Sequence, residues 1–246
     1  MNTMTLDDAN EAAKSAATDF SHLLVSQWQA ALGAELIGVY LVGSLGHAGF
    51  SRRYSDVDIA LITETGLSQQ ALNHMRSEAV ALSAEWGGKL SIFWADRHFR
   101  VGRFPPLDRV DYIDHAVALT ERERVLPMRP TLAEIQLYLS GAPFADWKES
   151  ALRFATSEAL DPKDRKKYLK TLLYPARLCY SWMTGGIGSN DDAVAFLSEI
   201  RPPGFDINLI TRALQCRQAA ADPDQLFSER ATLPSQVEAC AAQIAD

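Results

Sequence analysis

The sequence predicts an α+β protein, in which a mixed sheet with helices is followed by an all-helical bundle. Short apolar runs, which are typical of strands, alternate with segments of helical spacing in the first half of the chain. After Pro127 and Pro130 the apolar residues recur only at helical spacing. The 246 residues are enough for two compact cores. We therefore expect two domains, at residues 1–130 and 131–246.

Two helices and three strands are expected in the N-terminal domain. The expected helices cover residues 7–32 and 67–86, and the expected strands cover residues 36–42, 56–62 and 90–94. Gly33 is typical of the end of the first helix, and Gly87 with Gly88 stops the second. This order of helices and strands is typical of a small domain with one sheet.

The C-terminal domain carries signals for helix starts and ends. Thr131 and Glu134 match a capping box that opens its first helix. A long helical segment follows at residues 164–184, and Gly185 is expected to end it. Pro175 lies inside this segment and is expected to kink or break it, because proline has no N–H for the helical hydrogen bond.

Composition excludes several classes of protein. Lys and Arg number 24 against 31 Asp and Glu, so the net charge of −7 makes a nucleic-acid partner unlikely. The three cysteines are far apart and form no CxxC pair, which argues against a zinc cage or a disulfide framework. Residues 1–10 lead into no long apolar run, and no run is long enough to cross a membrane. We expect a cytoplasmic protein without a membrane partner, and the sequence leaves its oligomeric state open.

One group of polar residues stands out between the first two expected strands. Gly43 and Ser44 follow the first strand, and after eleven intervening residues Asp56 and Asp58 open the second. Glycine lets the backbone approach a ligand closely, and serine offers a hydroxyl and an N–H to an anion. Side chains two apart on a strand share a face, so the two carboxylates lie side by side. Because their like charges repel, we expect a cation to neutralise them. Such oxygen ligands suit Mg²⁺ together with a phosphate-containing substrate.

This spacing of Gly43-Ser44 and Asp56-Val57-Asp58 between apolar strands resembles the signature of the DNA polymerase β-type nucleotidyltransferase superfamily. The resemblance implies that the N-terminal domain is a nucleotidyltransferase domain. It also implies that Asp56 and Asp58 are catalytic and bind Mg²⁺, and that Gly43, Ser44 and Ser55 contact the nucleotide.

A second segment, Arg177-Leu-Cys-Tyr-Ser-Trp-Met-Thr-Gly-Gly-Ile187, is similar to a C-terminal helix of the aminoglycoside (streptomycin/spectinomycin) adenylyltransferases. Those enzymes have the same layout at nearly this length. The resemblance implies that Arg177 binds the phosphates of the nucleotide. It places Asn190 where the family has a phosphate-binding lysine, so Asn190 is the candidate at that position.

The third expected strand departs from the family pattern. The family has a further carboxylate there, which acts as general base or completes the metal site, and the residue in phase here is Ser91. Asp96, at the end of the strand, can replace it only if the strand is shifted or bent. His47 is the other candidate for the missing base.

Phe99, Phe104 and the rigid pair Pro105-Pro106 follow the third strand directly. They either form a wall of an acceptor pocket or pack in the core, and both interpretations stay open.

The resemblance implies a Mg²⁺-dependent enzyme that moves a nucleoside monophosphate to a hydroxyl of a small molecule. The expected donor is ATP, from which AMP is transferred. One alternative is a weak or inactive nucleotide-binding module of the same fold, because Ser91 and Asn190 depart from the pattern. Another is a nucleotidyltransferase that modifies proteins. The acceptor and any link to antibiotic resistance cannot be read from the sequence.

Overall fold

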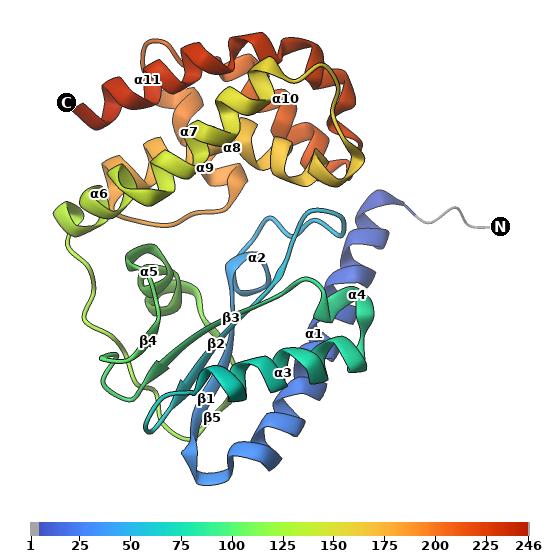
Figure 1. Ribbon diagram of the computed structural model, residues 1–246, viewed down its shortest axis with the longest axis vertical. Helices are drawn as coiled ribbons and strands as arrows, with labels where there is room; N and C mark the ends of the chain where they lie inside the picture. Colours follow the sequence, from blue (N-terminus) through green and yellow to red (C-terminus); the bar gives the residue numbers. More distant parts are fainter. Residues whose placement is uncertain (1–4, 246) are drawn as a thin grey trace. The chain divides into compact units, whose positions relative to one another are not determined.

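The computed structural model describes residues 5–245 (Figure 1). Part of the expectation about the N-terminal stretch rests on residues 1–4, which lie outside this range. The chain divides into two compact units, Met1–Arg129 and Pro130–Asp246. Unit 1 holds a mixed five-stranded sheet with helices, and the described part of unit 2 consists of helices. The predicted α+β fold class is confirmed.

Unit 1 is built on a sheet with the strand order β4-β3-β2-β1-β5. Its elements are α1 (Leu6–Leu32), η1 (Gly33–Glu35), β1 (Leu36–Val42), α2 (Gly43–Gly46), β2 (Val57–Thr63), α3 (Gln69–Leu82), α4 (Ala84–Gly87), β3 (Leu90–Asp96), β4 (Gly102–Arg103), α5 (Pro106–His115) and β5 (Val117–Glu121). β2 and β3 run parallel, whereas β1 is antiparallel to β2 and β5, and β4 is antiparallel to β3.

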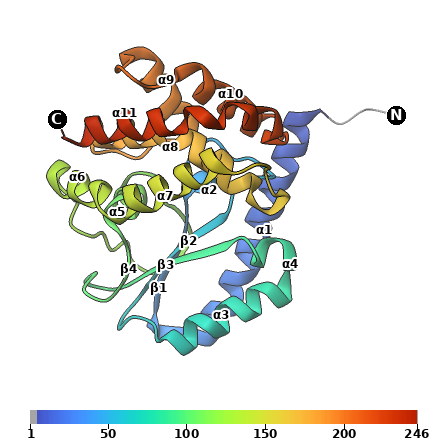
Figure 2. The same ribbon diagram turned by 45° about the horizontal axis from the view of Figure 1, so that its top comes forward.

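Each face of the sheet packs against a different set of helices (Figures 1 and 2). On one face Ile59 of β2 joins a cluster with side chains of α1 and α3, including Trp28 and Leu72. On the other face Ala60 belongs to a cluster with Tyr112 of α5. Because side chains alternate along a strand, Asp58 lies on the same face of β2 as Ala60, which is the face that α5 covers.

The boundaries of several elements differ from the sequence prediction. β2 begins at Val57, so Asp56 lies just before the strand, and β3 extends to Asp96. The predicted helix of residues 67–86 is two helices, α3 and α4, because Ser83 has an extended backbone and its hydroxyl accepts the N–H of Trp86. α5, β4 and β5 were not predicted.

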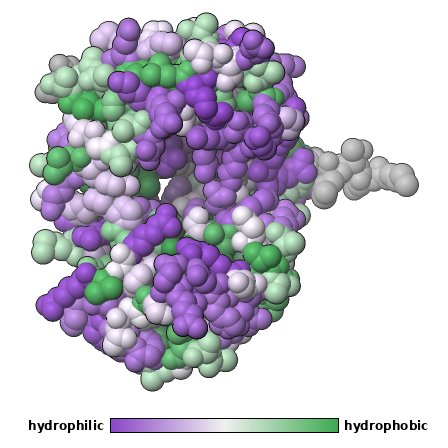
Figure 3. Space-filling view, in the orientation of Figure 1, coloured by the Kyte–Doolittle hydropathy of each residue, from purple (hydrophilic) through white to green (hydrophobic). Residues whose placement is uncertain are grey.

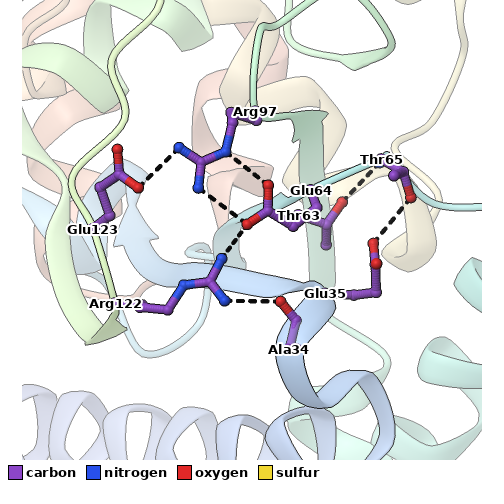
Figure 4. A network of polar contacts seen from close by, with 9 residues as sticks. Ala34, Glu35, Thr63, Glu64, Thr65, Arg97, Arg122 and Glu123 are labelled. Atoms are coloured by element: carbon purple, nitrogen blue, oxygen red, sulfur yellow. Dashed lines mark hydrogen bonds and ion pairs between the residues drawn. The ribbon is translucent and has the colours of Figure 1, made fainter.

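An ion-pair network ties together the strand ends on one side of the sheet (Figure 4). Arg97, after β3, binds Glu64, after β2, through two nitrogens at 2.7 and 3.0 Å, and binds Glu123 at 2.8 Å. Arg122 contacts Glu64 as well and donates to the carbonyl of Ala34 at 2.9 Å. These guanidinium groups lower the pKa of Glu64 to about 2, with the hydrogen bonds from Arg97 as the largest cause.

Unit 2 is organised around α8, which packs against its other long helices. Its elements are α6 (Leu132–Ser140), α7 (Ala142–Thr156), η2 (Pro162–Asp164), α8 (Arg165–Thr184), α9 (Asn190–Ile200), α10 (Ile207–Gln218), η3 (Pro223–Thr232) and α11 (Leu233–Ala245). The capping box of Thr131 and Glu134 opens α6, and Gly185 ends α8 in the left-handed conformation, as predicted.

Pro175 does not break α8, which continues through it as one helix. The missing N–H of Pro175 leaves the carbonyl of Thr171 without its helical donor. The indole N–H of Trp147, on α7, donates to this carbonyl at 3.0 Å. A side chain from a neighbouring helix therefore replaces the lost hydrogen bond, which the spacing within residues 164–184 cannot reveal.

Within the described range, no helix combines the length and the apolar character needed to cross a membrane. In the view of Figure 3, hydrophilic residues cover most of the visible surface, and apolar residues form small, separate groups.

Candidate functional site

The turn after β1 brings the backbone against a carboxylate. Gly43 opens the short helix α2 with φ of +60°, and a Cβ on it would lie 2.6 Å from Oδ2 of Asp58. This closeness follows from the sheet, because Val42 of β1 pairs with Asp58 of β2. Glycine is needed here both for the left-handed backbone and for the close approach. The Gly-Ser turn and Asp58 are therefore in contact, as the motif predicts.

Two serines join the turn to the loop that leads back into β2. The hydroxyl of Ser44 donates to the hydroxyl of Ser55 at 2.9 Å, and the N–H of Ser51 donates to the same oxygen at 2.9 Å. Ser55 is buried, and its own N–H donates to the carbonyl of Ser51. Gly43, Ser44, Ser55 and Asp58 thus lie together, and Asp56 follows Ser55 directly. The hydroxyl of Ser55 fastens the loop to Ser44.

The two partly exposed carboxylates fit a particular kind of metal site. Asp56 and Asp58 lie two residues apart where β2 begins, and both provide hard oxygen ligands. Among residues 5–245 no group of three or more His, Cys, Asp or Glu side chains is arranged to hold a metal ion. These residues therefore suit Mg²⁺ only where substrate phosphates complete its coordination, which is how Mg²⁺ usually binds proteins.

The neighbouring strand supplies no carboxylate at this end. Asp58 pairs with Ser91 of the parallel strand β3, so Ser91 occupies the position in phase, as the sequence indicates. Asp96 pairs with Thr63, five residues further along, which is roughly 17 Å at the rise of a strand. β3 is continuous from Leu90 to Asp96, with no shift or bend in its register with β2 that would bring Asp96 back.

The carboxylate of Asp96 has another role. It accepts the backbone N–H groups of Arg100 at 2.7 Å and Val101 at 2.9 Å and so closes the loop after β3. These hydrogen bonds, with Val101 the largest cause, lower the pKa of Asp96. The hypothesis that Asp96 replaces the missing general base is therefore corrected: Asp96 is the last residue of β3, at the opposite end of the strand from Ser91, and its carboxylate stabilises the loop that follows.

A further carboxylate, Asp111 of α5, reaches the turn and was missed by the sequence analysis. Its Oδ2 accepts the N–H of Gly43 at 2.6 Å, and the residue is only 4% exposed. Asp58 and Asp111 both touch Gly43, so their carboxylates lie within about 8 Å of each other. The only sequence signal for this residue is an acid between the apolar residues Val110 and Tyr112.

His47 lies beside Asp111. Its Nε2 is 3.8 Å from Oδ1 of Asp111, and its Nδ1 is 2.9 Å from the carbonyl of Ala48. Since a carbonyl only accepts, the hydrogen bond to Ala48 needs the proton of Nδ1. The 3.8 Å from Nε2 is too long for a hydrogen bond, so Oδ1 of Asp111 is buried without a hydrogen-bond partner among the described residues. The ring of His47 also packs edge-on against His115, with centroids 5.4 Å apart.

The two remaining candidates belong to unit 2. Arg177 lies on the exposed side of α8, and Asn190 is the first residue of α9. Within unit 2 the two helices pack against each other, partly through Tyr180 of α8 and Phe196 of α9.

No protein-family model matches the sequence, and no curated protein matches it significantly. A similar fold is found in the crystal structure of spectinomycin adenyltransferase AAD(9) from Enterococcus faecialis with ATP and spectinomycin. The TM-score is 0.66, the sequence identity is 13%, and the match covers 90% of this chain and 99% of that chain. The chain therefore has the nucleotidyltransferase-like fold that its sequence motifs predict.

Proposed function

We propose that this chain is a nucleotidyltransferase that binds a nucleoside triphosphate with Mg²⁺ and transfers the nucleoside monophosphate to a hydroxyl of a small molecule. Unit 1 is then the nucleotidyltransferase domain, and unit 2 is the helical domain that carries Arg177 and Asn190. ATP is the proposed donor, because the structure of similar fold was solved with ATP.

One observation supports this proposal above the others. The turn of Gly43 and Ser44 lies against the carboxylate of Asp58, at the distance where a Cβ on Gly43 would collide with it. A phosphate at the turn would therefore meet the backbone N–H of Ser44 and the metal-binding carboxylates, while the N–H of Gly43 stays bound to Asp111. A turn that served only packing would not need to lie so close to the carboxylate of Asp58.

Each residue has a separate task in the proposed reaction. Asp56 and Asp58 would hold Mg²⁺, which supplies charge neutralisation on the transferring group. Ser44 would donate its backbone N–H to a phosphate oxygen, while its hydroxyl stays hydrogen-bonded to Ser55. Asp111 anchors the N–H of Gly43 and so sets the position of the turn. Rate acceleration would come mainly from positioning and charge.

The register of β3 supports a second candidate function. Ser91 faces the place where a nucleotidyltransferase of this kind has a third carboxylate. A domain without a general base can still bind a nucleotide, and its rate of transfer falls by about 10²–10⁴. The alternative is therefore a nucleotide-binding module with little or no transfer activity.

Pyrophosphate release tests the first proposal. The full chain is incubated with each nucleoside triphosphate, Mg²⁺ and a panel of small hydroxyl compounds that includes spectinomycin, which the similar structure contains. We expect acceptor-dependent release with one nucleotide, and a loss of about 100-fold or more in Asp58→Asn. Asp19→Asn, which removes an exposed carboxylate of α1, is the matched control. Binding of a nucleotide without release under any condition would favour the second candidate.

A further inference from the structure

A cavity of about 300 Å³ opens in unit 1 beside the loop after β3. Arginines and apolar side chains line it, among them Arg100, Arg103, Phe99 and Phe104. Its volume lies at the lower end of the range for small-molecule pockets. The cavity lies beside β4, the edge strand of the sheet, and beside the start of α5.

Three of the lining residues are arginines without an acidic partner. Arg100, Arg103 and Arg109 form no ion pair within the described residues. Arg109 is held by a hydrogen bond from its Nε to the carbonyl of Phe104 at 2.9 Å. Four other arginines of unit 1, Arg97, Arg122, Arg124 and Arg129, each pair with a carboxylate, whereas Arg52 and Arg76 form no ion pair among residues 5–245. What distinguishes Arg100, Arg103 and Arg109 is that they line one cavity, where the mutual repulsion of their guanidinium groups favours the entry of an anion.

The rest of the cavity wall is apolar. Phe99 and Phe104 meet edge to face, with ring centroids 5.5 Å apart. Val101 is 53% exposed, although it is a large apolar residue. Pro105 adds a rigid apolar surface. A ligand that fits this wall has an apolar portion as well as a negative charge.

The loop that carries these residues is fixed in shape. Phe99 has φ of +53°, a left-handed conformation that a bulky residue adopts only where its surroundings impose it. The carboxylate of Asp96 holds the N–H groups of Arg100 and Val101. Gly102 has φ of +144°, and a Cβ there would lie 2.1 Å from the carbonyl of Trp94. The cavity is therefore preformed, which lowers the entropy lost on binding.

We propose that this cavity, called the arginine cavity below, binds a small organic anion, a carboxylate or phosphate attached to a flat apolar group. The planar fork of a guanidinium binds either oxyanion through two hydrogen bonds. The site is separate from the proposed nucleotide site: Ala95 lies four residues along β3 from Ser91, and the buried cluster around Tyr112 fills the face between them. The inference goes beyond the proposed function and does not depend on it.

Titration calorimetry and ligand-detected NMR on the full chain test this proposal with three probes. Phenyl phosphate and benzoate carry the two anions on the same ring, and benzyl alcohol is the neutral control. We expect at least one anionic probe to bind, benzyl alcohol to bind more weakly, and the affinity to fall at higher salt. The stronger of the two anionic probes identifies the oxyanion.

Substitutions locate the binding. Arg100→Gln and Arg103→Gln are each expected to lower the affinity for the anionic probe about tenfold, which is the effect of losing a charge-assisted hydrogen bond. Arg76→Gln, on α3 at the other face of the sheet, removes the same charge and should leave binding unchanged. Binding that survives both cavity variants, or that all three probes share equally, overturns the proposal. Loss of binding in Asp58→Asn with retention in the cavity variants also overturns it, because the probe would then occupy the nucleotide site.

Discussion

The two ends of the sheet face that α5 covers have opposite electrostatic character. At one end Asp58 and Asp111 both touch Gly43, and Asp56 lies beside them. At the other end three arginines line a cavity, and none of them forms an ion pair with a residue of the described range. The acidic end suits a metal with phosphates, and the basic end suits an anion without a metal. The short helix α5 links the two ends. The position of a residue along α5 or β3 therefore determines whether it lies at the acidic end or at the basic end.

The largest effect is expected from a substitution in the turn at the acidic end. Gly43→Ala would force a Cβ into the carboxylate of Asp58 in a left-handed backbone. We expect nucleotidyl transfer, or nucleotide binding if transfer is absent, to fall about 100-fold, because misplacement by about 1 Å has effects of that size. Measured rates or dissociation constants check this.

Gly33→Ala is the matched control for this change. Gly33 has φ of +53°, but nothing lies within 4 Å of a Cβ there. Alanine at a positive φ costs roughly 1–3 kcal/mol of backbone strain at either position, but at Gly33 it meets no neighbouring atom and should leave the site unchanged. Equal losses of function in the two variants would contradict the role assigned to the contact between Gly43 and Asp58.

A smaller effect is expected from the anchor of the turn. Asp111→Ala leaves the N–H of Gly43 without its acceptor and opens a small void, so unfolding in urea should show a loss of about 1–3 kcal/mol. Asp111→Asn keeps an acceptor oxygen and should lose less stability. If neither variant changes stability or nucleotide affinity, Asp111 does not position the turn.

The smallest effect concerns the network of Glu64 and its two arginines. The folded-state pKa of Glu64, about 2, lies below the ordinary value near 4.5. The contribution of Glu64 to stability is therefore present at neutral pH and disappears as the pH falls from about 4.5 toward 2. Urea unfolding of wild type and Glu64→Gln across this range should show a difference that shrinks with falling pH. A difference that stays constant would exclude the carboxylate charge as its source.

Local patterns in the sequence predict much of this structure. β1, the capping box of α6 and the end of α8 follow from apolar spacing and from capping residues close together in the chain. The contact between the Gly-Ser turn and Asp58 comes from the antiparallel pairing of β1 and β2, which places Val42 opposite Asp58.

Long-range contacts explain what the sequence could not predict. Asp111 meets Gly43 across 68 residues, and the helix that carries it had no recognised pattern. Trp147 compensates for Pro175 from another helix. Asp96 was placed in the wrong site because the sequence does not fix where β3 ends or which backbone groups its carboxylate binds.

Calorimetric titration of ATP with Mg²⁺ into wild type, Asp58→Asn and Asp96→Asn tests the central claim most directly. Both variants lose one negative charge from the same sheet, at opposite ends, and asparagine can still accept the N–H groups that Asp96 holds. We expect wild type and Asp96→Asn to bind ATP in a Mg²⁺-dependent way, and Asp58→Asn to bind at least tenfold more weakly. Equal binding by all three proteins, or loss only in Asp96→Asn, would contradict a nucleotide site at the acidic end.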